Sequence, residues 1–227
     1  MSDGNSRAVT SNQNGVHDDL EKVVKKHLIT EFKKPFAEYS LQTFNKLTLF
    51  VQDYLSQHPS HQVILDSCCG VGESTYHLAL ENPDCLVIGI DKSEHRIDKH
   101  SHHQQQELKN LINIRGDLND LWRLIADAQW PIKTHYILYP NPWPKSKHLQ
   151  RRWHGAPVFS SIPKLSKTIV VRSNWHIYIE EFALALKYVG IHAEVQQYCS
   201  ENAMTPFERK YWASGQLSFQ LEAELKS

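Results

Sequence analysis

From about residue 60 onward, short apolar runs alternate with amphipathic stretches, and this alternation constrains the fold more than any other feature of the chain. The apolar runs have the length of buried strands and occur in QVILD, CLVIGID, LINIRGD, HYILYP and TIVVRSN. Helical patterns separate them, at residues 73–81, 93–108, 118–127, 157–164 and 175–189. Strands that alternate with helices form βαβ units around a parallel sheet. Two final segments, IHAEVQQY and QLSFQLEAEL, alternate in polarity as antiparallel edge strands do. We therefore predict an α/β fold with a mostly parallel sheet.

The first 60 residues have a different character. Residues 1–17 are small and polar, rich in Ser, Asn and Gly, and predict a flexible arm. Residues 18–60 carry two helical patterns and predict a helical extension. Residues 61–227 then form the main domain, because a chain of 227 residues is long enough for one such domain with an appendage.

Composition excludes several classes of protein. Lys plus Arg equals Asp plus Glu at 25 each, so the overall charge indicates neither a nucleic-acid nor a membrane partner, and any basic surface must be local. The four cysteines show neither zinc-ligand spacing nor a disulfide pattern, and we expect no metal. The sequence shows no apolar run of membrane-spanning length. We expect a soluble cytoplasmic protein, and the sequence leaves open whether it is a monomer or a homodimer.

Acidic residues stand at the ends of three successive predicted strands. Asp66 ends the first and is followed by a turn with Gly70 and Gly72, while Asp91 and Asp117 end the next two. Ligands of open α/β sheets bind beyond the carboxyl ends of the strands, and a carboxylate there can accept from ribose hydroxyls. Each acid could instead cap the following helix, and the glycine turn could be a plain strand-to-helix connection. The three acids together favour an adenosyl ligand.

The glycine turn indicates which adenosyl ligand. The segment DSCCGVG has the DxGxGxG spacing of S-adenosylmethionine sites, with Cys68 in place of the first glycine, rather than the GxGxxG spacing of dinucleotide sites. A side chain at this position is a departure, because the glycine normally lets the backbone approach the ligand.

The end of the fourth predicted strand carries the most specific motif. PNPWPK, at residues 140–145, is followed by a basic run with two adjacent arginines, and VVRSNW and TPFERKYWASGQLSFQLE follow later. These segments resemble, in order, the PDPWPK motif, the TDW-like strand end and the TKFE segment of the tRNA (guanine-N7)-methyltransferases. The N-terminal RAVTSNQNG is similar to a Thr- and Gln-containing segment of the same family.

The resemblance implies a fold, a reaction and a set of contacts. It implies a class I methyltransferase with a Rossmann-like seven-stranded sheet, which transfers methyl from S-adenosyl-L-methionine to N7 of guanine in the variable loop of tRNA and leaves S-adenosyl-L-homocysteine. It implies donor contacts from the three acids, the glycine turn and Asn141, with Asn141 also catalytic. The substrate contacts it implies, or that the basic run adds, are Lys145, Arg151, Arg152, Asn174, Thr205, Phe207 and Glu208.

Two departures from the family keep other activities open. Asn141 and Asn174 both stand where the family has Asp, and an amide keeps the hydrogen-bonding carbonyl but removes the charge that would stabilise a cationic base. The acceptor could therefore be an exocyclic amine of RNA or a small molecule. With Cys68, the same departures are also compatible with a paralogue that binds S-adenosylmethionine or RNA without catalysis.

The basic run has two interpretations. No acidic residue interrupts Lys145, Lys147, His148, Arg151 and Arg152, and Trp143 and Trp153 flank them, which suits RNA phosphates and bases. The run could also be solvated surface charge, with Trp143 packed as a lid over the core. The histidines at 95–103 are expected on an exposed polar helix face rather than around a metal.

Overall fold

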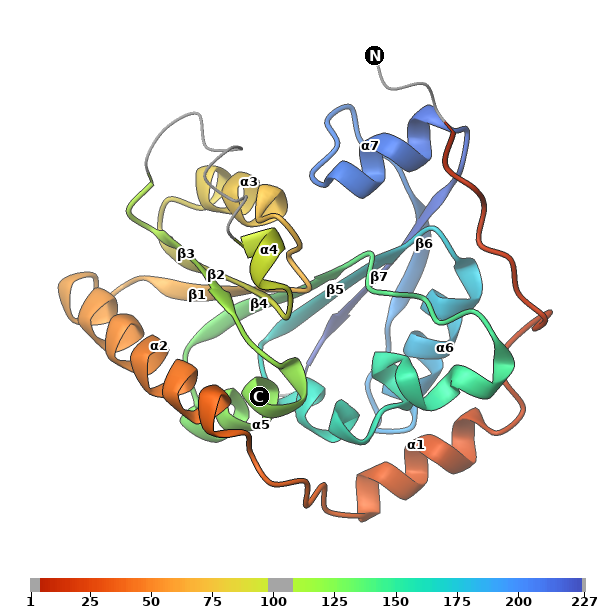
Figure 1. Cartoon of the computed structure of the whole chain (residues 1–227), viewed down its shortest axis with the longest axis horizontal. Coiled ribbons are helices and arrows are strands. Elements are labelled where there is room, and N and C mark those ends of the chain that lie inside the picture. Colours follow the sequence, from red (N-terminus) through yellow and green to blue (C-terminus); the bar gives the residue numbers. More distant parts are fainter. Residues whose placement is uncertain (1–4, 98–107, 226–227) are drawn as a thin grey trace.

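A computed structural model describes residues 5–97 and 108–225. Its centre is one seven-stranded sheet in the order β3-β2-β1-β4-β5-β7-β6 (Figure 1). The strands are β1 (Gln62–Ser67), β2 (Cys85–Asp91), β3 (Leu111–Arg115), β4 (Ile132–Leu138), β5 (Thr168–Ser173), β6 (Glu194–Tyr198) and β7 (Ser218–Glu224). The first five pair in parallel, and β7 is antiparallel to both β5 and β6. The predicted α/β class with an antiparallel edge is confirmed.

Both faces of the sheet are covered, which explains why the central strands are apolar without alternation. Along β1, Val63 and Leu65 face the larger core cluster, which also includes residues of α1, α2, α5 and α6, while Ile64 faces a smaller cluster with Leu78 of α3. Figure 1 shows α3 and α7 on one side of the sheet and α1, α2, α5 and α6 on the opposite side.

The α-helices are α1 (Leu20–Ile29), α2 (Glu38–Gln57), α3 (Glu73–Glu81), α4 (Glu94–Ile97), α5 (Leu118–Ala128), α6 (His176–Lys187) and α7 (Pro206–Ala213). Three 3₁₀ segments, η2 (Ser146–Arg151), η3 (Trp153–Gly155) and η4 (Pro157–Lys164), connect β4 to β5. The helix expected at 157–164 is thus a 3₁₀ segment, and Pro163 inside it cannot donate an α-helical hydrogen bond. Of the helix expected at 93–108, residues 98–107 lie outside the described part of the chain.

The N-terminal arm differs from the flexible segment that its composition predicts. Residues 5–17 have no helix or strand, yet they run along the molecule from α7 towards α1 (Figure 1). Ser6 N–H donates to Ser214 Oγ at 3.0 Å, and Ser11 Oγ donates to the Pro144 carbonyl at 2.6 Å. In the structure the arm therefore packs on the main domain near the carboxyl ends of the strands.

The strand order reverses between β1 and β4. Successive strands proceed outward from β1 through β2 to β3 on one side, and from β4 to β5 on the other. Such a reversal separates the loops that follow the two central strands and opens a crevice at their carboxyl ends. Among the described residues, no helix is both long and apolar enough to cross a lipid bilayer.

Candidate active site

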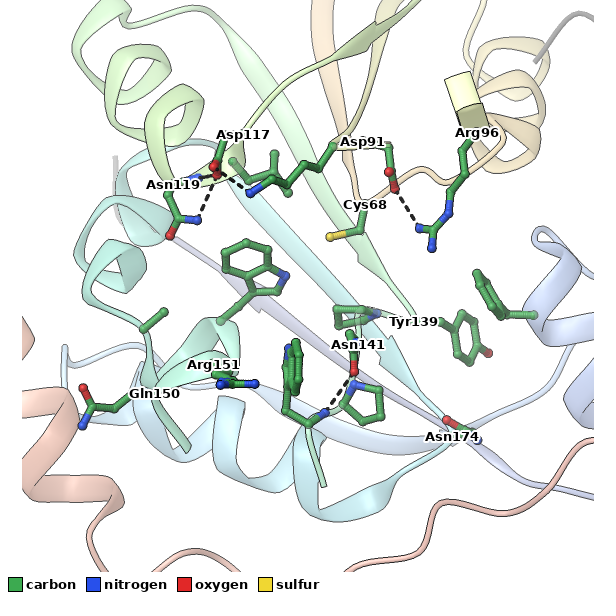
Figure 2. Close-up of a pocket in the computed structure, with 18 of the residues that line it drawn as sticks. Cys68, Asp91, Arg96, Asp117, Asn119, Tyr139, Asn141, Gln150, Arg151 and Asn174 are labelled. Atoms are coloured by element: carbon green, nitrogen blue, oxygen red, sulfur yellow. Dashed lines mark hydrogen bonds and ion pairs between the residues drawn. The ribbon is translucent and has the colours of Figure 1, made fainter. Parts of the chain in front are cut away.

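A pocket of about 720 Å³ opens at this crevice. It is lined by residues that follow five different strands, among them Cys68, Asp91, Asp117, Asn141 and Asn174 (Figure 2). Its volume is within the range of small-molecule sites, about 300–1,000 Å³. The fold thus brings most of the predicted strand-end residues to one place.

Asp91 ties the glycine turn to the second strand. Its Oδ2 accepts from Gly70 N–H at 3.1 Å, and its Oδ1 accepts from Ser93 N–H at 2.8 Å. Arg96 lies 3.4 Å from the same carboxylate. Each carboxylate oxygen has two acceptor sites, so Asp91 can still accept from a ligand hydroxyl. It lines the pocket, as expected of a donor contact.

Asp117 combines the two roles that the sequence left open. Its Oδ1 caps α5 by accepting from Asn119 N–H at 3.0 Å, and its Oδ2 accepts from Lys92 Nζ at 3.1 Å. Although burial opposes it, these bonds from Asn119 and Lys92 lower the pKa of Asp117 below its ordinary value. The carboxylate is thus ionised at neutral pH and also lines the pocket.

Asp66 lies behind the pocket rather than on its wall. It is 0% exposed, and its Oδ2 accepts from Ser74 Oγ at 2.7 Å and Thr75 Oγ1 at 2.8 Å. Burial raises the pKa of Asp66 to about 6. The carboxylate therefore fastens the end of β1 to the first turn of α3, and Gly70 and Gly72, at φ +61° and +78°, complete the turn between them.

Three non-glycine residues of the pocket wall adopt left-handed backbone angles. Cys68, Tyr139 and Trp143 have φ of 64°, 50° and 45°, and all three line the pocket. Such a conformation costs an L-residue about 1–2 kcal/mol, and strain of this kind gathers at functional sites. Cys68 Sγ points into the cavity (Figure 2), and burial raises the pKa of its thiol to about 12, so the side chain is neutral.

Amides and aromatic rings form the other half of the pocket. Asn141 Oδ1 accepts from Trp143 N–H at 3.3 Å, and Asn174 Nδ2 donates to Gln216 Oε1 at 2.9 Å. Tyr139, Trp143, Phe207 and Tyr211 surround them. Among the pocket-lining residues in the described ranges, the only carboxylates are Asp91 and Asp117, both at the opposite end.

The two adjacent arginines occupy different environments. Arg151 is exposed, lines the pocket and lies with its guanidinium 4.8 Å from the centre of the Trp143 ring. Arg152 is 0% exposed and pairs with the equally buried Glu181 at 2.6 Å. The predicted substrate contact of Arg152 thus has no exposed guanidinium in this structure, because protein encloses it.

A similar correction applies to the segment after β6. Phe207 is 41% exposed and lines the pocket, as expected of a substrate contact. Thr205 is buried and caps α7 by accepting from Glu208 N–H at 3.0 Å. Glu208 is 0% exposed, and its carboxylate accepts from Arg172 at 3.0 Å and Met204 N–H at 2.6 Å. Thr205 and Glu208 hold α7 in place, and the predicted substrate contact has no exposed side chain at either residue in this structure.

Lys145 lies outside the main pocket. It lines a second, more open cavity together with Lys147 and the arm residues Thr10, Ser11 and Asn12. The arm, whose composition predicts a flexible segment, thus supplies one wall of a basic surface next to the PNPWPK loop.

Glu181 is a structural residue of this site that no sequence motif indicated. This carboxylate receives Arg152, lies 2.8 Å from His154 Nε2, and is buried on the same helix face as Tyr178 and Phe182. The bond from His154 and the charge of Arg152 outweigh burial and lower the pKa of Glu181 to about 2. An acidic residue on the apolar stripe of a helix was the available signal.

The comparisons with known proteins agree with this geometry. A family model described as "Putative methyltransferase" matches residues 60–220. The chain belongs to this methyltransferase family. The match spans β1 to β6, the first residues of β7 and every residue that lines the main pocket, so the family assignment and this pocket concern the same part of the molecule.

Curated relatives carry a more specific name. The tRNA (guanine-N(7)-)-methyltransferase of Lysinibacillus sphaericus is 29% identical over 178 residues, covering 68% of this chain and 76% of that protein. The enzyme of the same name from Streptococcus mutans is 24% identical, covering 74% of this chain and 82% of its own.

Solved structures show the same fold. The 16S rRNA methyltransferase KamB superposes with a TM-score of 0.57 at 15% identity, covering 86% of this chain and 96% of its own. A 16S rRNA (adenine(1408)-N(1))-methyltransferase from Catenulisporales acidiphilia, solved with its cosubstrate SAM, superposes with a TM-score of 0.55 at 15% identity, covering 78% of this chain and 92% of its own. The expected Rossmann-like class I methyltransferase fold is confirmed.

Proposed function

We propose that this methyltransferase uses S-adenosylmethionine to methylate N7 of guanine in tRNA, at the variable loop. The observation that carries the proposal is that a single pocket contains both Asp91 and Asp117 and residues 140–143 of the PNPWPK loop, which lie 23 residues or more beyond these acids in the sequence. The names of the curated relatives support the same acceptor.

The acidic half of the pocket fits the donor. Asp91 would accept from the ribose hydroxyls, and Asp117, ionised and fixed by Lys92 and Asn119, would accept from the adenine amino group. The neutral Cys68 would form the floor next to them. When bound, S-adenosylmethionine supplies a methyl group on a sulfonium centre. Asp66 would support this half indirectly, by holding the glycine turn.

The aromatic half fits the acceptor base. Guanine N7 has a lone pair and no proton to lose, so transfer depends on positioning and electrostatics rather than on a general base or a metal. Phe207 and Tyr211, whose ring centres lie 6.1 Å apart, would offer an apolar wall to the base. Asn141, oriented by Trp143 N–H, would present its amide to the reacting edge, and Asn174 would bind the same base from the β5 side.

The basic surface fits the RNA backbone. Arg151 at the pocket rim, and Lys145 and Lys147 in the cavity beside it, would neutralise phosphates on the two sides of the acceptor nucleotide. A neutral overall composition does not oppose this role, because these cations lie within one short segment.

The test is incorporation of labelled methyl from S-adenosylmethionine into tRNA that lacks N7-methylguanosine, followed by nuclease digestion and nucleoside analysis. We expect N7-methylguanosine. Because the acceptor half contains the amides of Asn141 and Asn174 and no lining carboxylate in the described ranges, an exocyclic amine is the second candidate acceptor. A methylated adenosine or an N2-methylguanosine in the digest would replace the first proposal by the second, and no product despite donor binding would contradict both.

A further inference from the structure

A buried ion pair lies directly beneath the PNPWPK loop. Arg152 and Glu181 are each 0% exposed, and Arg152 Nη1 donates to Glu181 Oε2 at 2.6 Å. Taking two charges out of water costs several kcal/mol for each ion, so a fully enclosed pair is weak evidence of added stability. The other hydrogen bonds of Arg152 and Glu181 therefore indicate the role of the pair.

On one side, the pair holds the acceptor loop, which we define as residues 140–147. Arg152 Nε donates to the Trp143 carbonyl at 3.2 Å, and its Nη2 lies 3.4 Å from the Lys145 carbonyl. Trp143 has a left-handed φ of 45° and lines the active-site pocket. The guanidinium thus fixes the backbone at the most strained position of the loop.

On the other side, the same pair holds the N-terminal arm through one amide. Gln13 Oε1 accepts from Arg152 Nη2 at 3.0 Å, while Gln13 Nε2 donates to Glu181 Oε1 at 2.6 Å. His17 N–H donates to that same oxygen at 2.9 Å. The amide of Gln13 therefore complements both charges, because its oxygen accepts from the Arg152 cation and its nitrogen donates to the Glu181 anion.

The arm and the acceptor loop also bind each other directly. Asn12 Oδ1 accepts from Ser146 N–H at 3.0 Å, and Ser11 Oγ donates to the Pro144 carbonyl at 2.6 Å. These bonds exist only while the arm lies in place. Gln13 follows Ser11 and Asn12 in the arm, and its side chain binds the arm to the buried charges of Arg152 and Glu181.

We propose that the Arg152–Glu181 pair is a positioning device that couples the arm to the acceptor loop, with Gln13 as the link. When Gln13 is engaged, the loop keeps the conformation that presents Asn141 and Trp143 to the pocket. The effect of this coupling on turnover rests on the proposed function. The coupling between arm and loop does not depend on that function. The four side chains Gln13, Asn141, Arg152 and Glu181 thereby belong to one functional unit, although only Asn141 faces the pocket.

The first test replaces the link and leaves the buried pair intact. In Gln13→Ala, we expect the N–H groups of the non-proline residues at 141–147 to exchange with deuterium at least about tenfold faster, because the arm no longer holds the loop through bonds such as that from Ser146 N–H. The matched control is Asn14→Ala, at an exposed neighbouring position of the arm. Unchanged exchange in Gln13→Ala would overturn the proposal, and this measurement needs neither donor nor tRNA.

The second test separates positioning from general destabilisation. In Gln13→Ala, kcat for tRNA methylation should fall about tenfold at saturating donor, while the Kd for S-adenosylhomocysteine changes less than about twofold, because no described residue of the arm lines the main pocket. A Kd that weakens together with kcat would overturn the positioning role. Inactivity of the wild-type chain on tRNA would defeat the proposed function but leave the exchange test standing.

A third variant replaces the anionic member of the pair, Glu181. Glu181→Gln keeps the shape but removes the charge that binds Gln13 and Arg152, and Glu180→Gln, whose side chain is 40% exposed, is its neighbouring control. We expect faster exchange of residues 141–147 in the first variant alone. If Glu181→Gln behaves as Glu180→Gln does, the ion pair does not couple the arm to the loop.

Discussion

Replacing each of the two adjacent arginines with methionine should have opposite consequences. Methionine keeps an unbranched apolar stem like that of arginine but removes the guanidinium and its charge. In Arg152→Met, Glu181 remains 0% exposed without its cation. Removing one partner of a buried pair costs about 3–5 kcal/mol of unfolding free energy. Arg151 is exposed, and its replacement should change that free energy by no more than about 0.5 kcal/mol.

RNA binding should show the reverse pattern. Arg151→Met should reduce the slope of log K against log salt concentration by up to about one, since one phosphate contact is lost. Folded Arg152→Met should keep the wild-type slope, because a buried guanidinium releases no counterion from RNA.

The assay is urea unfolding of both variants at pH 7, followed by RNA binding at several salt concentrations under conditions where both are folded. Adding Glu181→Gln to Arg152→Met removes the stranded charge and should recover a large part of the lost stability. Equal, small losses of stability in the two single variants would refute the interpretation of Arg152 as half of a buried pair.

Three further variants test the pocket. Because burial raises the pKa of Asp66 from 3.8 to about 6, the folded protein retains a proton that the unfolded chain releases, and stability is lost as pH rises through this window. Relative to wild type, Asp66→Asn should therefore gain about 3 kcal/mol of unfolding free energy between roughly pH 4 and pH 7, and parallel pH curves would contradict this. Cys68→Gly relieves a φ of 64° and should raise unfolding free energy by up to about 1 kcal/mol while tightening S-adenosylhomocysteine binding by calorimetry; weaker binding would mean that the thiol contacts the donor. Asn141→Ala should lower kcat at least about tenfold at saturating donor, and a wild-type kcat would exclude a catalytic role.

The strand-end acids illustrate what the sequence could predict. Apolar runs identify parallel strands, and topology then places their carboxyl ends together, so Asp91 and Asp117 could be assigned to one pocket without knowledge of side-chain packing. Asp66 obeys the same pattern but lies behind the turn, because Ser74 and Thr75 on α3 compete for its carboxylate. Sequence spacing alone does not distinguish a residue that lines the pocket from one that holds the pocket-forming turn in place.

The arginine pair illustrates what the sequence could not predict. Arg151 ends a 3₁₀ segment and Arg152 starts the extended link to the next one, and this single step of backbone turns one side chain to solvent and the other into the core. The buried partner, Glu181, is 29 residues away along the chain. The position of the arm depends on the Arg152–Glu181 pair through Gln13. It could not be predicted either, because the polar composition of the arm does not indicate what the arm binds.

The antiparallel course of β7 has a practical consequence for labelling the protein. Glu224 pairs with Thr168 at the amino end of β5, so β7 ends at the edge of the sheet opposite the pocket. The described part of the N-terminal arm starts at the pocket end of the strands, where Ser6 is hydrogen-bonded to Ser214 and Gln216 beside α7. A fluorophore or affinity handle attached behind β7 should leave the pocket mouth open to a large RNA, whereas the same group fused ahead of the arm would stand next to that mouth.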